Sequence, residues 1–98
     1  MIQILLAEDD EPMRLYLERA LTRSGYGVTA VGDGRAALDL FEAGQIFDLL
    51  LTDIVMPELD GIQLAQQVAT IAPGTRVMFI TGFSAVTLRA GQELPNAK

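Results

Sequence analysis

The sequence predicts an α/β fold, a doubly wound parallel sheet, on the basis of three observations. Short apolar runs alternate with segments of helical periodicity along the 98 residues, and this alternation favours parallel strands joined by right-handed crossovers. Residues 49–51 are apolar at every position, as in a strand covered on both faces. Polar residues directly follow three of the apolar runs, and open α/β sheets bind ligands at the carboxyl ends of their strands. We therefore expect one domain with a site at one edge of the sheet.

Four short apolar segments bounded by turn residues are predicted to be strands. They lie at residues 2–7, 27–31, 48–52 and 76–80. Pro57 prevents the third strand from continuing, because proline cannot donate a hydrogen bond within a sheet.

The segments between these strands have the periodicity of amphipathic helices. Proline and acidic residues favour a helix start, aspartate caps it, and glycine favours its end. The predicted limits are Pro12 and Gly25, Asp33 and Gly44, and Asp60 and Gly74, and a fourth short helix is predicted from Ser84 to about Ala90. In the first helix the residues at helical spacing are Met13, Leu17, Ala20, Leu21 and Ser24, and in the second the residues that share one face are Ala37, Leu40 and Phe41. In the third helix the residues predicted to point inward are Leu64, Ala65, Val68 and Ala72.

The composition disfavours several classes of function. The chain has no cysteine and no histidine, so it lacks thiolate and imidazole ligands and histidine-based catalysis. Its net charge of −6 disfavours nonspecific binding to nucleic acid or to an anionic membrane. No apolar stretch is long enough to cross a bilayer and no secretion signal is evident, so we expect a cytoplasmic protein.

Carboxylates at the strand ends predict a magnesium site. Glu8 and Asp9 follow the first strand, Asp53 follows the third and Thr81 the fourth. If these strands are neighbours, three carboxylates converge, and such a cluster requires bound protons or a cation. Oxygen ligands without histidine or cysteine select Mg²⁺. The site suits phosphoryl transfer to Asp53, with the Thr81 hydroxyl donating to a phosphoryl oxygen; taken singly, these residues are also compatible with a solvated helix start and a loop acid.

Three motifs, in the same order along the chain, resemble the response-regulator receiver domains of the CheY type. They are Leu-Leu-Ala-Glu-Asp-Asp at 5–10, Leu-Thr-Asp-Ile-Val-Met-Pro-Glu-Leu-Asp-Gly at 51–61, and Ile-Thr-Gly at 80–82. The resemblance covers essentially the whole chain and implies a flavodoxin-like or CheY-like sheet of strand order 2-1-3-4-5. It also implies a fifth strand and a last helix that these residues do not include, so the receiver domain over 1–98 is expected to be incomplete at its carboxyl end.

The resemblance implies a role for each residue of the predicted site. Asp53 is expected to accept a phosphoryl group from a phosphohistidine on a histidine kinase or histidine phosphotransferase. Asp9 is expected to bind Mg²⁺ directly and Glu8 through a water molecule, and the backbone carbonyl of Val55 is expected to be a further ligand. Thr81 is expected to act as the switch hydroxyl that responds to phosphorylation.

The chain departs from the family pattern at two places. The family's lysine lies on a fifth strand, whereas Lys98 follows Thr81 too closely for that role. If the chain ends at residue 98, the fourth strand becomes an edge and the first helix loses part of its cover, so we expect a dimer, a swapped assembly or aggregation. Val55 and Phe83 replace the polar side chains that often orient water for dephosphorylation, which predicts slow self-dephosphorylation. Alternatively, Phe83 is a packing residue or a partner contact.

Several segments look most like the CpdR-type stand-alone receivers of alphaproteobacterial cell-cycle control. These segments are 5–10, 50–57, 79–86 and 96–98. The resemblance implies that the unphosphorylated form primes the ClpXP protease through a contact with ClpX or a protease substrate. A phosphorylation-independent adaptor and the receiver part of a longer transcription regulator remain open alternatives. An aspartyl phosphatase is disfavoured, because Val55 stands where such enzymes typically place a second acid.

Overall fold

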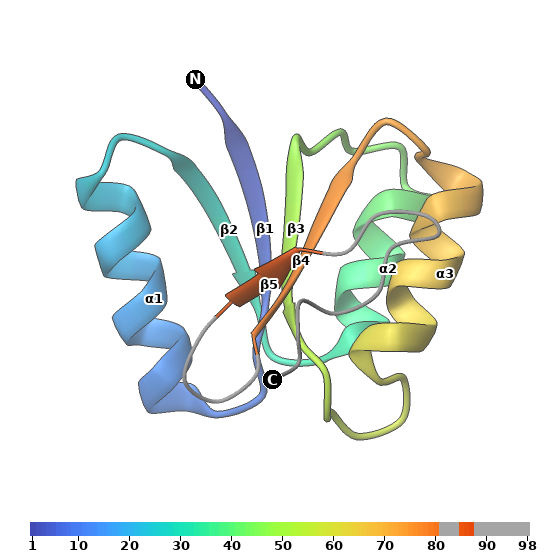
Figure 1. Cartoon of the computed structure of the whole chain (residues 1–98), viewed down its shortest axis with the longest axis horizontal. Helices are drawn as coiled ribbons and strands as arrows, with labels where there is room; N and C mark the ends of the chain where they lie inside the picture. The colour runs from blue at the N-terminus through green and yellow to red at the C-terminus, as the bar shows by residue number, and fades with distance from the viewer. Residues whose placement is uncertain (81–84, 88–98) are drawn as a thin grey trace.

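A computed structural model describes residues 1–80 and 85–87 and shows a sheet with helices on both faces (Figure 1). The strands are β1 (Gln3–Ala7), β2 (Gly27–Val31), β3 (Leu49–Asp53), β4 (Arg76–Ile80) and β5 (Ala85–Thr87). The helices are α1 (Glu11–Arg23), α2 (Gly34–Glu42) and α3 (Gly61–Ile71). Thr81, Phe83 and Lys98 lie outside the described residues.

The described strands form one sheet in the order β2-β1-β3-β4-β5, and β1 to β4 are parallel. This arrangement confirms the predicted parallel sheet, and each of the four predicted strands lies within one residue of an observed one. The register pairs Ala7 with Thr52 and Asp53 with Ile80. The carboxyl ends of β1, β3 and β4 consequently lie at the same edge of the sheet.

The strand β5 shows that the helix predicted from Ser84 to about Ala90 is wrong over residues 85–87. Ala85 pairs with Ile80, and Thr87 pairs with Met78, in antiparallel orientation. Val86 and Thr87 are β-branched residues, which favour strands, and their pairing satisfies backbone groups along the edge of β4. In the described part of the chain, β4 is therefore not the bare edge that we expected.

Each described helix begins after an aspartate whose side chain accepts a hydrogen bond from a backbone N–H group of the first turn. The pairs are Asp10 with Met13 at 3.0 Å, Asp33 with Ala36 at 2.7 Å and Asp60 with Gln63 at 2.8 Å. These caps satisfy donors that no helical carbonyl can reach. Gly25 and Gly44 follow α1 and α2 with φ angles of 98° and 91°, which glycine adopts without strain. No helix among the described residues is both long and apolar enough to span a bilayer.

The larger hydrophobic core lies between the sheet and the pair α2 and α3. Leu5, Leu50, Leu64 and Val68 are completely buried there, and their burial provides the main driving force for folding. The opposite face of the sheet is covered by α1 (Figure 1), which contains no fully buried residue. Ala20, at the helical spacing predicted for α1, is exposed, and the main contacts of α1 are with β2 and β1.

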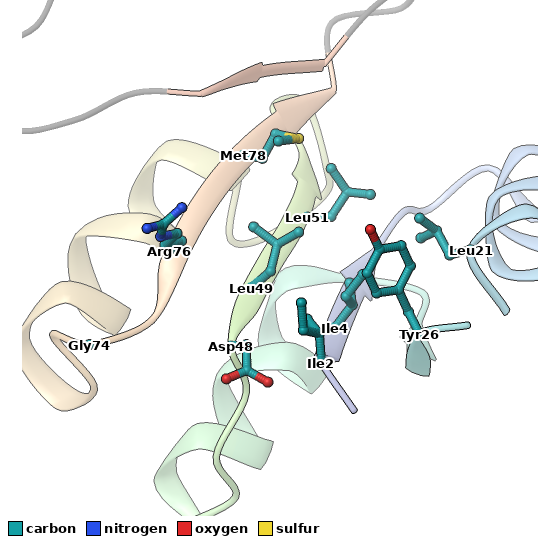
Figure 2. Close-up of a pocket in the computed structure, with 10 residues that line it drawn as sticks. All are labelled: Ile2, Ile4, Leu21, Tyr26, Asp48, Leu49, Leu51, Gly74, Arg76 and Met78. Atoms are coloured by element: carbon teal, nitrogen blue, oxygen red, sulfur yellow. The ribbon is translucent and has the colours of Figure 1, made fainter. Parts of the chain in front are cut away.

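An open apolar groove with a volume of about 670 Å³ lies beside α1 on that same face (Figure 2). Its lining side chains include Leu21, Tyr26, Ile4, Leu49, Leu51 and Met78. The predicted partial loss of cover for α1 depends on where the chain ends, and it stays a prediction. Association of two chains through this surface stays a prediction.

Candidate functional site

Three carboxylates meet at the carboxyl ends of β1 and β3. Glu8 and Asp9 follow β1, and Asp53 is the last residue of β3. One carboxylate oxygen from each residue lies within 4.8 Å of the other two. They meet because β1 and β3 are parallel neighbours whose carboxyl ends share one edge of the sheet. The structure therefore brings together the three acids that the sequence predicted, while Thr81 lies outside the described residues.

Glu8 is the buried member of the cluster, with 3% of its surface exposed. Burial raises the pKa of the Glu8 carboxyl group, and this is the largest influence on it. The N–H group of Asp10 donates to Glu8 Oε2 at 3.1 Å and lowers this pKa. The charges of Asp53 and Asp9, and a hydrogen bond with the Asp53 side chain, raise it again. Without a cation, these surroundings therefore make the Glu8 carboxyl group harder to ionise than an ordinary glutamate.

The backbone around Asp53 is held by three hydrogen bonds. The N–H group of Ile54 donates to Asp53 Oδ1 at 2.8 Å, and the Thr52 hydroxyl donates to the carbonyl oxygen of Asp53 at 2.9 Å. Gly61 at the start of α3 donates its N–H to the Ile54 carbonyl at 2.8 Å. The backbone that bears the half-buried Asp53 side chain is thus hydrogen-bonded within the end of β3 and to the start of α3.

The donor set fits a hard divalent cation. All three acids offer oxygen atoms, and the chain contains no histidine or cysteine. Mg²⁺ prefers oxygen ligands, usually one or two carboxylates completed by water and phosphate oxygens. A dication would also neutralise the repulsion among the three carboxylates. The cluster could therefore hold a metal ion, and Mg²⁺ agrees with the chemistry of its ligands.

The connection from β3 to α3 carries the exposed side chain of Val55. This side chain is 78% exposed, two residues after Asp53. Further along the connection, Glu58 has a φ angle of 68°, in the left-handed region that non-glycine residues rarely adopt. The conformation of Glu58 was not predictable from the sequence, because no glycine or asparagine marks the position.

Sequence reasoning did not predict a contact between Arg14 and the acidic turn. Arg14 Nη1 donates to the carbonyl oxygen of Glu8 at 2.9 Å. The only signal in the sequence is an arginine in the first turn of the helix that follows the acids, and an arginine there is equally compatible with a solvated side chain.

Glu8→Gln is expected to change how stability depends on pH. Because the pKa of Glu8 is raised by folding, the folded chain binds this proton more tightly than the unfolded chain does. Without Mg²⁺, stability therefore falls as the pH rises from the ordinary glutamate value through the raised one. Glutamine cannot ionise, so Glu8→Gln should be more stable than the parent at neutral pH.

Urea unfolding in EDTA at several pH values measures this difference. Glu11→Gln serves as the control, because Glu11 is an exposed glutamate outside the cluster. An identical fall in stability with pH for Glu8→Gln and the parent would contradict the prediction.

Comparisons with known proteins agree with the geometry of this site. A family model described as the response regulator receiver domain matches residues 4–92. The response regulator receiver protein CpdR of Brucella abortus is 50% identical over 97% of this chain and 78% of its own length. The sensor kinase CckA of the same organism is 34% identical over 83% of this chain, which corresponds to 9% of the kinase.

A similar solved structure is the response regulator TrrA of Thermotoga maritima in complex with Mg²⁺ and BeF. Its TM-score is 0.78 at 28% identity, and the match covers 86% of this chain and 72% of that one. This similarity confirms the CheY-like fold. Other curated relatives are longer: the chain spans 38% of the regulator MprA of Mycolicibacterium vanbaalenii and 34% of the regulatory protein TcrA of Mycobacterium tuberculosis.

Proposed function

The chain belongs to the response regulator receiver domain family, and we propose that it is a phosphorelay response regulator that is phosphorylated on Asp53. The observation that carries this proposal is the meeting of oxygens from Glu8, Asp9 and Asp53 within 4.8 Å. Receiver domains are signalling domains rather than classical enzymes. The product of the proposed phosphoryl transfer is therefore the chain itself, phosphorylated on Asp53. The added charge then switches a protein–protein contact.

The phosphoryl transfer is an attack of an Asp53 carboxylate oxygen on the phosphorus atom of a phosphohistidine. A P–O bond forms while the P–N bond of the donor breaks, and the electron pair stays on the imidazole nitrogen, which takes up a proton. The Ile54 N–H group that bonds Oδ1 orients the carboxylate and leaves Oδ2 for the attack. A bound Mg²⁺ supplies charge neutralisation to the transferred group.

The chain's own groups hold that ion in distinct ways. The exposed Asp9 would bind it directly, and the buried Glu8 would act through a water molecule. The Val55 carbonyl supplies a further oxygen. Thr81, proposed as the switch hydroxyl, lies outside the described residues.

Intact mass after incubation with acetyl phosphate and Mg²⁺ tests the proposed function. We expect an increment of one phosphoryl group that is absent when EDTA replaces Mg²⁺. An unchanged mass under both conditions would contradict phosphorylation and favour a phosphorylation-independent adaptor.

We further propose that the donor is a histidine kinase or histidine phosphotransferase, and that the output is a contact with ClpX or a protease substrate. The family match and the similarity to CpdR support a receiver that takes part in a phosphorelay, and the ClpX contact is what the resemblance to the CpdR-type receivers implies. Binding of purified ClpX to the chain, before and after phosphorylation, provides the test. We expect binding by the unphosphorylated form alone, and equal binding by both forms would contradict the switch.

Val55→Asn combined with Phe83→Glu is expected to speed self-dephosphorylation by about tenfold, which corresponds to about 1.4 kcal/mol of barrier. Apolar side chains hinder the water that attacks the phosphoaspartate, whereas polar ones orient it. Val55 is 78% exposed, so its replacement leaves the core intact; Phe83 lies outside the described residues. Loss of the phosphoryl mass increment with time measures the rate.

Ile71→Asn at the far end of α3 is the control for this rate, because Ile71 is also a partly exposed apolar residue. Equal decay rates in the double variant and in Ile71→Asn would contradict the role of Val55 and Phe83.

A further inference from the structure

Arg14, in the first turn of α1, connects the ends of two strands beside the acidic site. Its Nη1 atom donates to the carbonyl oxygen of Glu8, just after β1, at 2.9 Å. The guanidinium also lies against Gly32, just after β2, where a Cβ atom would be 3.4 Å from Nη1 and 3.9 Å from Cζ. A Cβ atom at Gly32 would therefore be in ordinary van der Waals contact with the guanidinium, which shows how closely Arg14 lies against the end of β2.

Several hydrogen bonds fix the position of the turn that contains Glu8. The N–H group of Glu8 donates to the Val31 carbonyl at 3.1 Å, and the N–H group of Asp10 donates to Glu8 Oε2 at 3.1 Å. The N–H group of Arg14 donates to the Asp10 carbonyl at 2.9 Å. The Arg14 side chain also donates to the Glu8 carbonyl. Together these hydrogen bonds hold the backbone on both sides of Asp9, whose own side chain is exposed.

The contribution of Arg14 is geometric, because it forms no ion pair within the described part of the chain. The ion pairs found there join Arg35 to Asp39 and to Glu42. A positive charge near the acids would by itself repel a dication. If Arg14 supports metal binding, it must therefore do so through its hydrogen bond to the Glu8 carbonyl, which fixes the position of the turn.

We propose that Arg14 is a positioning residue for the Mg²⁺ site. It holds Glu8 and Asp9 where their oxygen atoms can reach the ion. This inference rests on the proposed function, because it assumes that the acids bind Mg²⁺. Residues that orient metal ligands commonly change metal affinity by about 10- to 100-fold when they are replaced.

Arg14→Met tests this role, because methionine keeps an apolar stem and removes both the charge and the hydrogen-bond donors. We expect about tenfold weaker binding of Mg²⁺ alone, measured by isothermal titration calorimetry. The matched control is Arg19→Met, which removes the same charge from an exposed position of the same helix. In the control, Mg²⁺ affinity should be unchanged or slightly higher, because only a repelling charge is lost. Equal affinities in the two variants would overturn the inference.

Gly32→Val tests the geometry without changing any charge. A Cβ atom at this position already contacts the guanidinium, and the two methyl groups of valine extend beyond it. We therefore expect the methyl groups to crowd the guanidinium away from Glu8 and to weaken Mg²⁺ binding here too. Hydrogen exchange of the Glu8 amide, followed by NMR, should become faster because the turn loosens. If circular dichroism shows that Arg14→Met does not fold, Gly32→Val decides, and an unchanged affinity in it overturns the inference.

The parent chain separates this inference from the proposed function. A parent that binds no Mg²⁺ and takes up no phosphoryl group contradicts both. A parent that does both, while Arg14→Met and Gly32→Val bind Mg²⁺ equally well, overturns only the role of Arg14.

Discussion

Asp53→Asn is expected to abolish phosphoryl uptake from acetyl phosphate. An uncharged amide is a far weaker nucleophile than a carboxylate, and the substitution also removes the negative charge of one of the three acids that meet at the proposed metal site. Asparagine has nearly the same shape, and its side-chain oxygen can still accept the hydrogen bond that Ile54 N–H donates to Oδ1. The fold should therefore persist while the mass increment disappears.

The control for this substitution is Asp10→Asn, one residue away from the cluster. The Asp10 side chain caps α1 by accepting a hydrogen bond from Met13, and asparagine caps helices about as well. We therefore expect Asp10→Asn to be phosphorylated like the parent, as judged by intact mass. An increment that persists in Asp53→Asn would place the acceptor elsewhere and contradict the assignment.

The elements predicted correctly from the sequence are those governed by local chemistry. Asp33 and Asp60 were expected to begin helices, and each caps one. The apolar run at 49–51 belongs to β3, which lies between β1 and β4. In these cases neighbouring residues determine the conformation, so the pattern of residue types is sufficient to predict it.

The features that the sequence did not predict depend on how one element packs against another, and the residue types of a single segment do not determine that packing. The strand β5 forms because β4 offers it an edge, and three residues carry too little pattern to distinguish a strand from a helix. The bond between Arg14 and Glu8 depends on how α1 lies against the ends of β1 and β2. By contrast, the convergence of Glu8 and Asp53 was predictable, since parallel neighbouring strands bring their carboxyl ends together.

Gly61 lies against the backbone of Asp53, so that a side chain at this position is expected to destabilise the fold. A Cβ atom at Gly61 would overlap the carbonyl oxygen of Asp53 and lie 3.0 Å from both the Asp53 carbonyl carbon and the Ile54 Cα. These are backbone atoms, which cannot rotate aside as the end of a flexible side chain can. Gly61 also donates its N–H group to the Ile54 carbonyl at 2.8 Å, so the close approach is part of the link between β3 and α3.

Gly61→Ala is therefore expected to lower the free energy of unfolding by about 3 kcal/mol, at the upper end of the usual cost of overpacking. The favourable helix propensity of alanine, worth about 1 kcal/mol in a helix interior, is too small to offset this loss. Gly74→Ala is the control, because no heavy atom lies within 4 Å of a Cβ built there, and we expect a change within about 0.5 kcal/mol. Urea unfolding of both variants gives the comparison, and equal stabilities would contradict the tight approach of α3 to Asp53. Since the overlap also shifts the Asp53 backbone, phosphoryl uptake should slow in Gly61→Ala but not in Gly74→Ala.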